Sequence, residues 1–234
     1  VKIAIIDSGL DSTHPQVVKL QESSKKWKNR RFSYYSTISQ SPADQDDCGH
    51  GTHGTVLLAK IAPNAEIHCI RTVAADGIVD SENVRKGIHY AIEQEVQIIS
   101  LSLGFPNEHE SIKQELEDAR RKKIIVFAAT SNSGANQRIS WPARDEAVFG
   151  VHASDHLGNT AVFGPSPTER LGNKSVFKTI GCNVLSAWPR GISVENGAPG
   201  IDTGDNGLQR RSSGTSTATP VAAGIAALVI EFAR

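Results

Sequence analysis

The chain has 234 residues, which is long enough for one large domain with a full hydrophobic core. Its 25 lysine and arginine residues equal its 25 aspartate and glutamate residues, so no net charge attracts nucleic acid or an anionic membrane. We also expect no membrane span, because no apolar run approaches the length that a bilayer requires.

The first residues of the chain do not resemble a signal peptide. Residues 1–6 lead directly into polar Asp7 and Ser8, without a basic region or a small-residue cleavage site. The chain contains no methionine, not even an initiator. We therefore expect residues 1–234 to form one domain excised from a longer chain, with a leader, propeptide or neighbouring domains outside it.

The three cysteines, Cys48, Cys69 and Cys182, cannot all pair within one chain. An odd number at scattered spacings is more typical of a reducing compartment than of a disulfide scaffold, which slightly favours a location inside the cell. One disulfide with a remaining free thiol is the alternative.

The first third of the chain predicts strands and one helix. Residues 2–7 are an apolar run that ends in a carboxylate, as in a central parallel strand. The basic residues 25–31 predict a solvated loop. Three more elements are expected in this part: strands at residues 32–35 and 66–72, and a helix at residues 49–61.

The rest of the chain continues this alternation. Two amphipathic helices are expected to begin at serine caps, Ser81 and Ser111, and to keep apolar residues at helical spacing. The glycine-rich residues 189–213 predict surface loops or a twisted hairpin. Further strands are expected at residues 97–103, 123–129, 148–153 and 184–187.

Strands that alternate with helices predict an α/β fold, a three-layer sandwich with a mostly parallel central sheet flanked by helices. In such sheets the chemistry collects at the carboxyl ends of the strands. That rule points to Asp7, to Gly104 and Phe105, and to the residues that follow Ala129.

The run SSGTSTATP at residues 212–220 precedes apolar residues 221–229, which predict a helix packed on nearly all sides. Ser216 then lies on its first turn, where free N–H groups and the helix dipole favour negative charge. An ordinary N-cap is the alternative interpretation of this serine. A nucleophilic serine needs a base, a group that holds the base, and donors to the oxyanion.

Three residues upstream are candidates for these parts. Asp7 ends the first strand, His50 lies in the run GHGTHGT at residues 49–55, and Asn132 lies in the run AATSNSG after a buried strand. Each residue has an ordinary alternative: a carboxylate that caps a turn, an exposed helix histidine and a turn asparagine.

The motifs at residues 7–9, 50–53, 132–134 and 214–220 resemble those of the subtilisin-like serine proteases (peptidase S8, subtilases) in order and rough spacing. The similarity covers nearly the whole chain. The run GTSTATP differs from the family's GTSMATP only at Thr217. The chain order Asp, His, Ser is also the order of this family.

The resemblance implies a subtilisin-like fold and a serine endopeptidase that acts on polypeptides through an acyl-enzyme, without a cofactor. Ser216 would attack the peptide carbonyl, His50 would accept and return its proton, and Asp7 would orient the imidazolium. The Asn132 side chain and the Ser216 backbone N–H would bind the oxyanion.

The resemblance also implies that substrate lies in extended form beside residues 102–104 and adds a strand there. Phe105 replaces the family's second glycine and is expected to place a bulky ring near this groove. The first specificity pocket is expected to have uncharged walls, which favour an apolar or uncharged side chain before the cut: Ser102, Leu103, Gly104, Ala128, Ala129 and Thr130.

Asp46 and Asp47 stand just before His50 and predict a solvated acidic loop. An alternative hypothesis is that they attract a basic substrate residue one position further from the cut, as in proprotein-processing relatives.

We expect no metal site. Cys48, His50 and His53 lack a fourth ligand at a recognisable spacing, and HGTH is not the HExxH of metalloproteases. Many relatives bind calcium in a long loop after the histidine helix, whereas Lys60 here runs almost directly into Pro63. Residues 179–181 replace the family's APG turn, at a place expected to be remote from the nucleophile.

Two other functions are open. A catalytically silent relative would bind peptides or partners through the same cleft of a larger protein, although every catalytic residue type is present. A serine hydrolase that is not a protease is less favoured, because the GxSxG elbow of esterases is absent.

Overall fold

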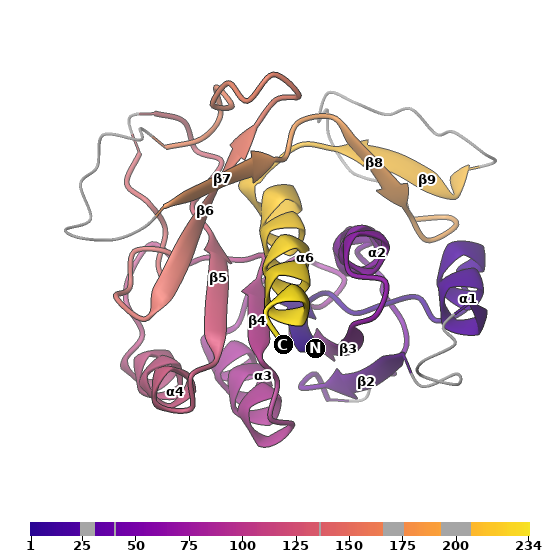
Figure 1. Ribbon diagram of the computed structural model, residues 1–234, viewed down its shortest axis with the longest axis horizontal. Coiled ribbons are helices and arrows are strands. Elements are labelled where there is room, and N and C mark those ends of the chain that lie inside the picture. Colours follow the sequence, from indigo (N-terminus) through magenta and orange to yellow (C-terminus); the bar gives the residue numbers. More distant parts are fainter. Residues whose placement is uncertain (24–30, 40, 136, 166–175, 193–206) are drawn as a thin grey trace.

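The computed structural model describes residues 1–234 except for residues 24–30, 40, 136, 166–175 and 193–206. A central sheet carries helices α3 (Ser81–Glu93) and α4 (Glu110–Arg121) on one face and α2 (His50–Ile61) and α6 (Thr215–Phe232) on the other (Figure 1). This arrangement confirms the predicted three-layer α/β sandwich.

The sheet has seven strands in the order β2-β3-β1-β4-β5-β6-β7, and every neighbouring pair is parallel. Its strands are β1 (Lys2–Asp7), β2 (Phe32–Ser36), β3 (Glu66–Arg71), β4 (Ile98–Leu101), β5 (Ile125–Ala129), β6 (Val148–Ser154) and β7 (Phe177–Ile180). The strand order reverses direction beside β1, so the connections after β1 and β4 diverge and leave a crevice at the carboxyl ends.

A separate hairpin pairs β8 (Val184–Ala187) with β9 (Gln209–Ser212) in antiparallel register and leads directly into α6. The prediction of loops or a twisted hairpin at residues 189–213 is confirmed at residues 209–212, which form β9 of this hairpin. Residues 193–206 of the same segment lie outside the described residues.

Two of the described elements were not predicted. Helix α1 (Pro15–Glu22) is short and mostly polar, and only Val17 in it is buried. Strand β7 forms the edge of the sheet and has no buried residue, so it lacks the apolar run that marks the inner strands.

The helix starts also differ from the predictions. The N-cap of α3 is Asp80, whose carboxylate accepts from the N–H of Asn83 at 2.8 Å, and the N-cap of α4 is His109. Ser81 and Ser111 are therefore not caps, although both helices form where their apolar spacing predicted.

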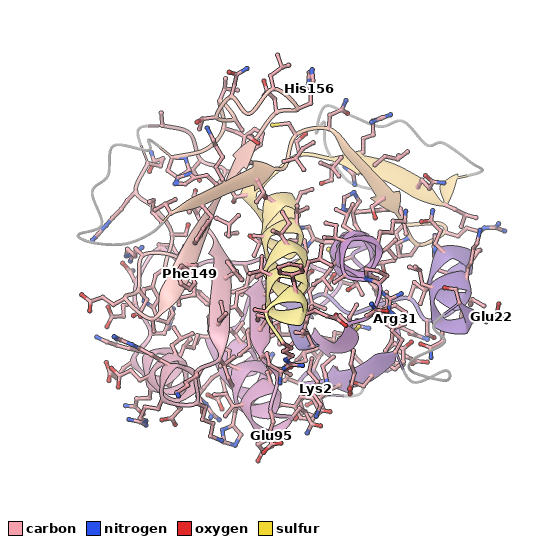
Figure 2. The ribbon with its side chains drawn as sticks, viewed as in Figure 1. Lys2, Glu22, Arg31, Glu95, Phe149 and His156 are labelled. Atoms are coloured by element: carbon pink, nitrogen blue, oxygen red, sulfur yellow. The ribbon has the colours of Figure 1, made fainter. Side chains whose placement is uncertain are left out.

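Arg31 corrects the prediction of a solvated loop at residues 25–31. Its side chain, labelled in Figure 2, is buried, and its Nη2 donates to the carbonyls of Ala59 (2.5 Å) and Ala62 (3.0 Å) at the end of α2. A cation at a helix C-terminus satisfies free carbonyls and complements the dipole. The other basic residues of this segment lie outside the described residues.

Helix α6 runs through the middle of its layer, but it is not packed on all sides. Its first half is buried, whereas Ile225, Leu228, Val229 and Phe232 are exposed. By length and composition this 18-residue helix could cross a membrane, so the expectation that no apolar run has that length is wrong. The signal is weak, because 56% of the helix is buried inside the fold and core helices pass the same test.

Candidate active site

Asp7, His50 and Ser216 meet at the carboxyl end of the sheet. His50 Nδ1 lies 2.8 and 2.9 Å from the two Asp7 carboxylate oxygens, and His50 Nε2 lies 2.9 Å from Ser216 Oγ. Residues that are 43 and 166 positions apart in the chain thus form one line of hydrogen bonds.

Each of the three residues stands at the end of a rigid element. Asp7 is the last residue of the buried strand β1, and its Oδ1 also accepts from the N–H of Ser8 at 2.7 Å. His50 is the first residue of α2, and Ser216 is the second residue of α6. The parallel sheet and the two helices that pack on it therefore fix all three positions.

Close backbone approaches explain the glycines around His50. Gly49 has φ 85°, and a Cβ there would lie 2.6 Å from the Trp188 ring. A Cβ on Gly51 would lie 2.2 Å from the Gly9 carbonyl oxygen. The start of α2 can approach the loop after β1 because Gly51 lacks a side chain, and Trp188 can pack on the N-cap because Gly49 lacks one.

Asp46 is buried beneath the start of α2, which corrects the prediction of a solvated acidic loop. Its exposed fraction is 4%. Its carboxylate accepts from Ser8 Oγ (2.8 Å) and from the backbone N–H groups of Cys48 (3.1 Å), Gly49 (2.8 Å) and Thr52 (2.7 Å). A carboxylate at this place satisfies free N–H groups of the first turn and complements the helix dipole.

Asp47 is also engaged, since its Oδ2 lies 2.6 Å from Nη2 of the buried Arg71. Arg71 Nη1 donates to the carbonyls of Pro42 and Gln45 as well. Neither carboxylate is a free charge, and the structure therefore gives no support to the hypothesis that they attract a basic substrate residue.

The charge of Asp7 raises the pKa of His50 above its ordinary value, although burial acts in the opposite direction. The Asp7 side chain is 6% exposed, whereas the His50 side chain is 33% exposed. The imidazole is thus reachable from solvent while its partner is shielded, and the pair favours the imidazolium that a proton transfer from Ser216 would create.

Asn132 lies against the start of α6. Its Oδ1 accepts from the backbone N–H of Thr215 at 2.8 Å, and the N–H of Ser131 donates to Thr215 Oγ1 at 3.3 Å. A Cβ built on Gly214 would lie 3.0 Å from Asn132 Nδ2 and 3.1 Å from Ser216 Oγ. The Asn132 NH₂ group and the Ser216 hydroxyl therefore both lie next to Gly214, and the amide oxygen is already held.

Residues 179–181 lie closer to the nucleophile segment than the sequence suggested. The Gly214 N–H donates to the Gly181 carbonyl at 2.8 Å, and Thr179 Oγ1 donates to the Ala218 carbonyl at 2.9 Å. A Cβ on Gly181 would lie 2.7 Å from the Gly214 carbonyl oxygen. This turn holds the first residues of α6 in place.

The six residues expected to wall the specificity pocket do not share one hollow. Ser102 and Leu103 line a hollow of about 220 Å³ beside Asp7 and His50. Val73 and Val79 give this hollow a largely apolar surface. Ala128, Ala129 and Thr130 are buried at the end of β5. Gly104 lines a second hollow of about 330 Å³, on the side of Asn132, together with Ser131, Ser133, Gln137, Arg138, Ser140 and Arg144.

Phe105 lines the second hollow, near the groove as expected, but most of its ring belongs to the core. It is 7% exposed, and its ring lies edge-on to His109 with centroids 4.6 Å apart and tilted to Trp141 at 6.2 Å. Its backbone pairs with that of Trp141 in both directions, at 2.6 and 2.9 Å.

Cys48, His50 and His53 do not converge on one point. The His53 ring points to the hairpin, where Nε2 lies 3.0 Å from the Val184 carbonyl and 3.2 Å from the Arg210 carbonyl. Among the described residues no three His, Cys, Asp or Glu side chains are grouped to hold a metal ion. The three cysteines are free thiols, so the alternative of one disulfide is wrong.

A profile of the subtilase family matches residues 1–234. Subtilisin BL from Lederbergia lenta is 31% identical over 238 aligned residues, which cover 98% of this chain and 76% of that protein. An alkaline protease from Alkalihalobacillus alcalophilus is also 31% identical, and the chain spans about half (53%) of its length. A lanthipeptide protease has the same fold, with a TM-score of 0.79, 24% identity, and coverage of 98% of this chain and 72% of that one.

Proposed function

The chain belongs to the subtilase family of serine peptidases, and we propose that it is an endopeptidase whose catalytic residues are Asp7, His50 and Ser216. The single observation that carries this proposal is the line of hydrogen bonds from the Asp7 carboxylate through the His50 ring to Ser216 Oγ. A nucleophile, a base and a group that orients the base are the three parts that such a serine needs.

The acylation step follows from this geometry. Ser216 Oγ forms a bond to the peptide carbonyl carbon while its proton passes to His50 Nε2, 2.9 Å away. Asp7 holds Nδ1 and stabilises the imidazolium. The C–N bond then breaks, and His50 returns the proton to the leaving amine. Water then attacks the acyl carbon while His50 takes its proton, and His50 gives this proton to Ser216 Oγ as the ester bond breaks.

Asn132 and the Ser216 backbone N–H supply donors to the oxyanion in this proposal. The Thr215 N–H holds the Asn132 amide oxygen, so the orientation of the amide is fixed in advance, with its NH₂ group next to Gly214. Donors fixed in advance are worth more than donors that must reorient, because they cost nothing when charge develops.

The substrate in this proposal is an extended polypeptide that lies along residues 102–104, between the two hollows. The hollow beside His50 offers an apolar surface from Val73, Val79 and Leu103. Such a peptide obtains affinity from main-chain hydrogen bonds and selectivity from the side-chain hollows. A propeptide or neighbouring domain in a longer protein would be a natural occupant of the same groove.

A fluorophosphonate probe tests the proposal, because it reacts only with an activated serine. We expect labelling of the wild-type chain and cleavage of unfolded casein, and loss of both in Ser216→Ala. The matched control is Ser213→Ala, which removes an exposed hydroxyl three positions away whose oxygen accepts from the Asn183 N–H. Folded wild-type protein that takes up no label would instead support a catalytically silent peptide-binding domain.

A further inference from the structure

The hollow on the Asn132 side has a distinctive charge. We call it the Arg138 pocket, and its charged and polar lining consists of Arg138, Arg144, Gln137, Ser131, Ser133 and Ser140. No aspartate or glutamate among the described residues lines it. The uncharged walls expected from the sequence are therefore replaced by two guanidinium groups.

The pocket adjoins the proposed reaction centre. Ser131 and Ser133 flank Asn132, whose NH₂ group and the Ser216 hydroxyl both lie next to Gly214. Gly104 belongs to the segment proposed to pair with substrate. A Cβ on Gly104 would lie 2.7 Å from Ser140 Cβ, so the two loops nearly touch there. A side chain next to the scissile bond would consequently enter between these loops.

The two arginines are held differently. Arg144 is half-buried, and it donates through Nη1 to the Ile139 carbonyl and through Nη2 to the Pro106 carbonyl, both at 2.8 Å. It thereby bridges the two loops that form the pocket. Arg138 is exposed and makes no hydrogen bond or ion pair with any residue that the structure describes.

The positive charge is confined to the Arg138 pocket and does not extend over the adjoining surface. Arg138 and Arg144 also border a second hollow, and there Glu108, Glu117, Asp145 and Glu146 balance four cations. Glu108 is already paired with Lys113 at 2.7 Å. The negative charge thus lies on the side away from Ser131 and Gly104, whereas the charged side chains that the structure describes toward the reaction centre are both arginines.

We propose that the Arg138 pocket binds the side chain immediately before the cut and favours a carboxylate, so that the enzyme cleaves preferentially after glutamate or aspartate. This inference rests on the proposed function and adds its substrate class. A guanidinium offers several donors in a planar fork that suits a carboxylate, and Arg138 has all of them unused among the described residues.

The test uses internally quenched peptides that are identical except for Glu, Gln, Leu or Lys before the cut, with the cleaved bond verified by mass spectrometry. Glu and Gln have nearly the same shape, so their kcat/KM ratio reports charge recognition. We expect a ratio of about five in favour of Glu, the size of one exposed ion pair, and a decrease at high salt.

Variants of Arg138 test whether the preference for glutamate comes from the pocket. Arg138→Gln is expected to bring the Glu/Gln ratio near one, and Arg138→Glu to favour Lys over Glu. The matched control, Arg120→Gln, removes an exposed arginine that lines neighbouring hollows and is not part of the Arg138 pocket, and it should keep the wild-type ratio. The inference about the pocket is wrong if the Gln and Leu peptides are cleaved with no preference for Glu, or if Arg138→Gln keeps the preference for Glu. Either result leaves the proposed function intact. Absence of both cleavage and probe labelling overturns the proposed function.

Discussion

The carboxylate of Asp46 accepts a hydrogen bond from the hydroxyl of Ser8 at 2.8 Å, and this bond ties the loop after β1 to the start of α2. Ser8 Oγ in turn accepts from the Gly51 N–H at 2.8 Å. Asp7 and His50 are the immediate neighbours of these groups. Their 2.8 Å contact therefore depends on a buried connection that touches neither reacting atom.

Asp46→Asn is expected to destabilise the fold and to weaken activity. The amide keeps one acceptor oxygen, whereas the carboxylate serves four donors, so buried N–H groups lose their partner. One unsatisfied buried group costs about 1–3 kcal/mol, and urea denaturation measures the loss. Asp44→Asn, in the same loop but exposed, is the control. Equal free energies of unfolding for the two variants would contradict this role of Asp46.

Activity is expected to fall as the pH decreases, because His50 must be neutral to accept the Ser216 proton. The Asp7 charge raises the pKa of His50, so protonation begins at a higher pH than for an ordinary histidine. The acidic limb of a kcat/KM profile should thus lie above about pH 6.5. Circular dichroism over the same range separates this titration from unfolding.

Asp7→Asn provides the matching variant for the pH profile. Without the carboxylate charge, the acidic limb of the residual activity should move to lower pH, and kcat should drop by roughly 10⁴-fold, as in other triads. A wild-type profile that is flat from about pH 5 to 8 would refute the assignment of His50 as base.

Asn132→Asp tests the proposed oxyanion donor while keeping an oxygen that can accept from the Thr215 N–H. The variant lacks the NH₂ donor, so kcat should fall while KM changes little. Loss of a side-chain donor costs about 10²- to 10³-fold in subtilisin itself, and we expect that magnitude. Full turnover in Asn132→Asp, with Asn132→Ala reduced only in stability, would show that Asn132 merely supports the start of α6.

The sequence predicted those parts of the fold that depend on local apolar patterns. The inner strands carry nearly continuous apolar runs because both faces of the sheet are covered, and β1 was therefore located at both ends. Edge strand β7 and helix α1 bury few residues and carry no such pattern. Their formation depends on neighbours, β6 and α2, that are distant in the chain.

The candidate site was predictable where motif residues stand at element ends, as Asp7 and Ser216 do. The burial of Asp46 was not predictable, because an aspartate pair in a polar segment usually indicates a solvated loop. The Arg138 pocket was missed for another reason. Its walls come from residues 131–133 and 137–144, which contact Gly104 only in the folded chain.

His53 is expected to make stability depend on pH. Burial lowers its pKa to about 4, while its Nε2 stays near the Val184 and Arg210 carbonyls. Because the folded value lies below the ordinary value of 6.5, the unfolded chain binds the proton more readily. The contribution of neutral His53 to the free energy of unfolding is fully present above about pH 6.5 and is lost as the pH falls from there to about 4. At 1.36 kcal/mol for each pKa unit, this loss amounts to roughly 3 kcal/mol.

Urea denaturation measures this loss, in the Ser216→Ala background so that the protein cannot digest itself. In His53→Gln the ring that must stay neutral is absent, so the free energy of unfolding should decline less between neutral pH and about pH 4 than in the parent. His156→Gln, at an exposed position, should follow the parent. Parallel declines for the parent and His53→Gln would mean that other groups, such as the buried His152, whose pKa burial also lowers, carry the acid sensitivity.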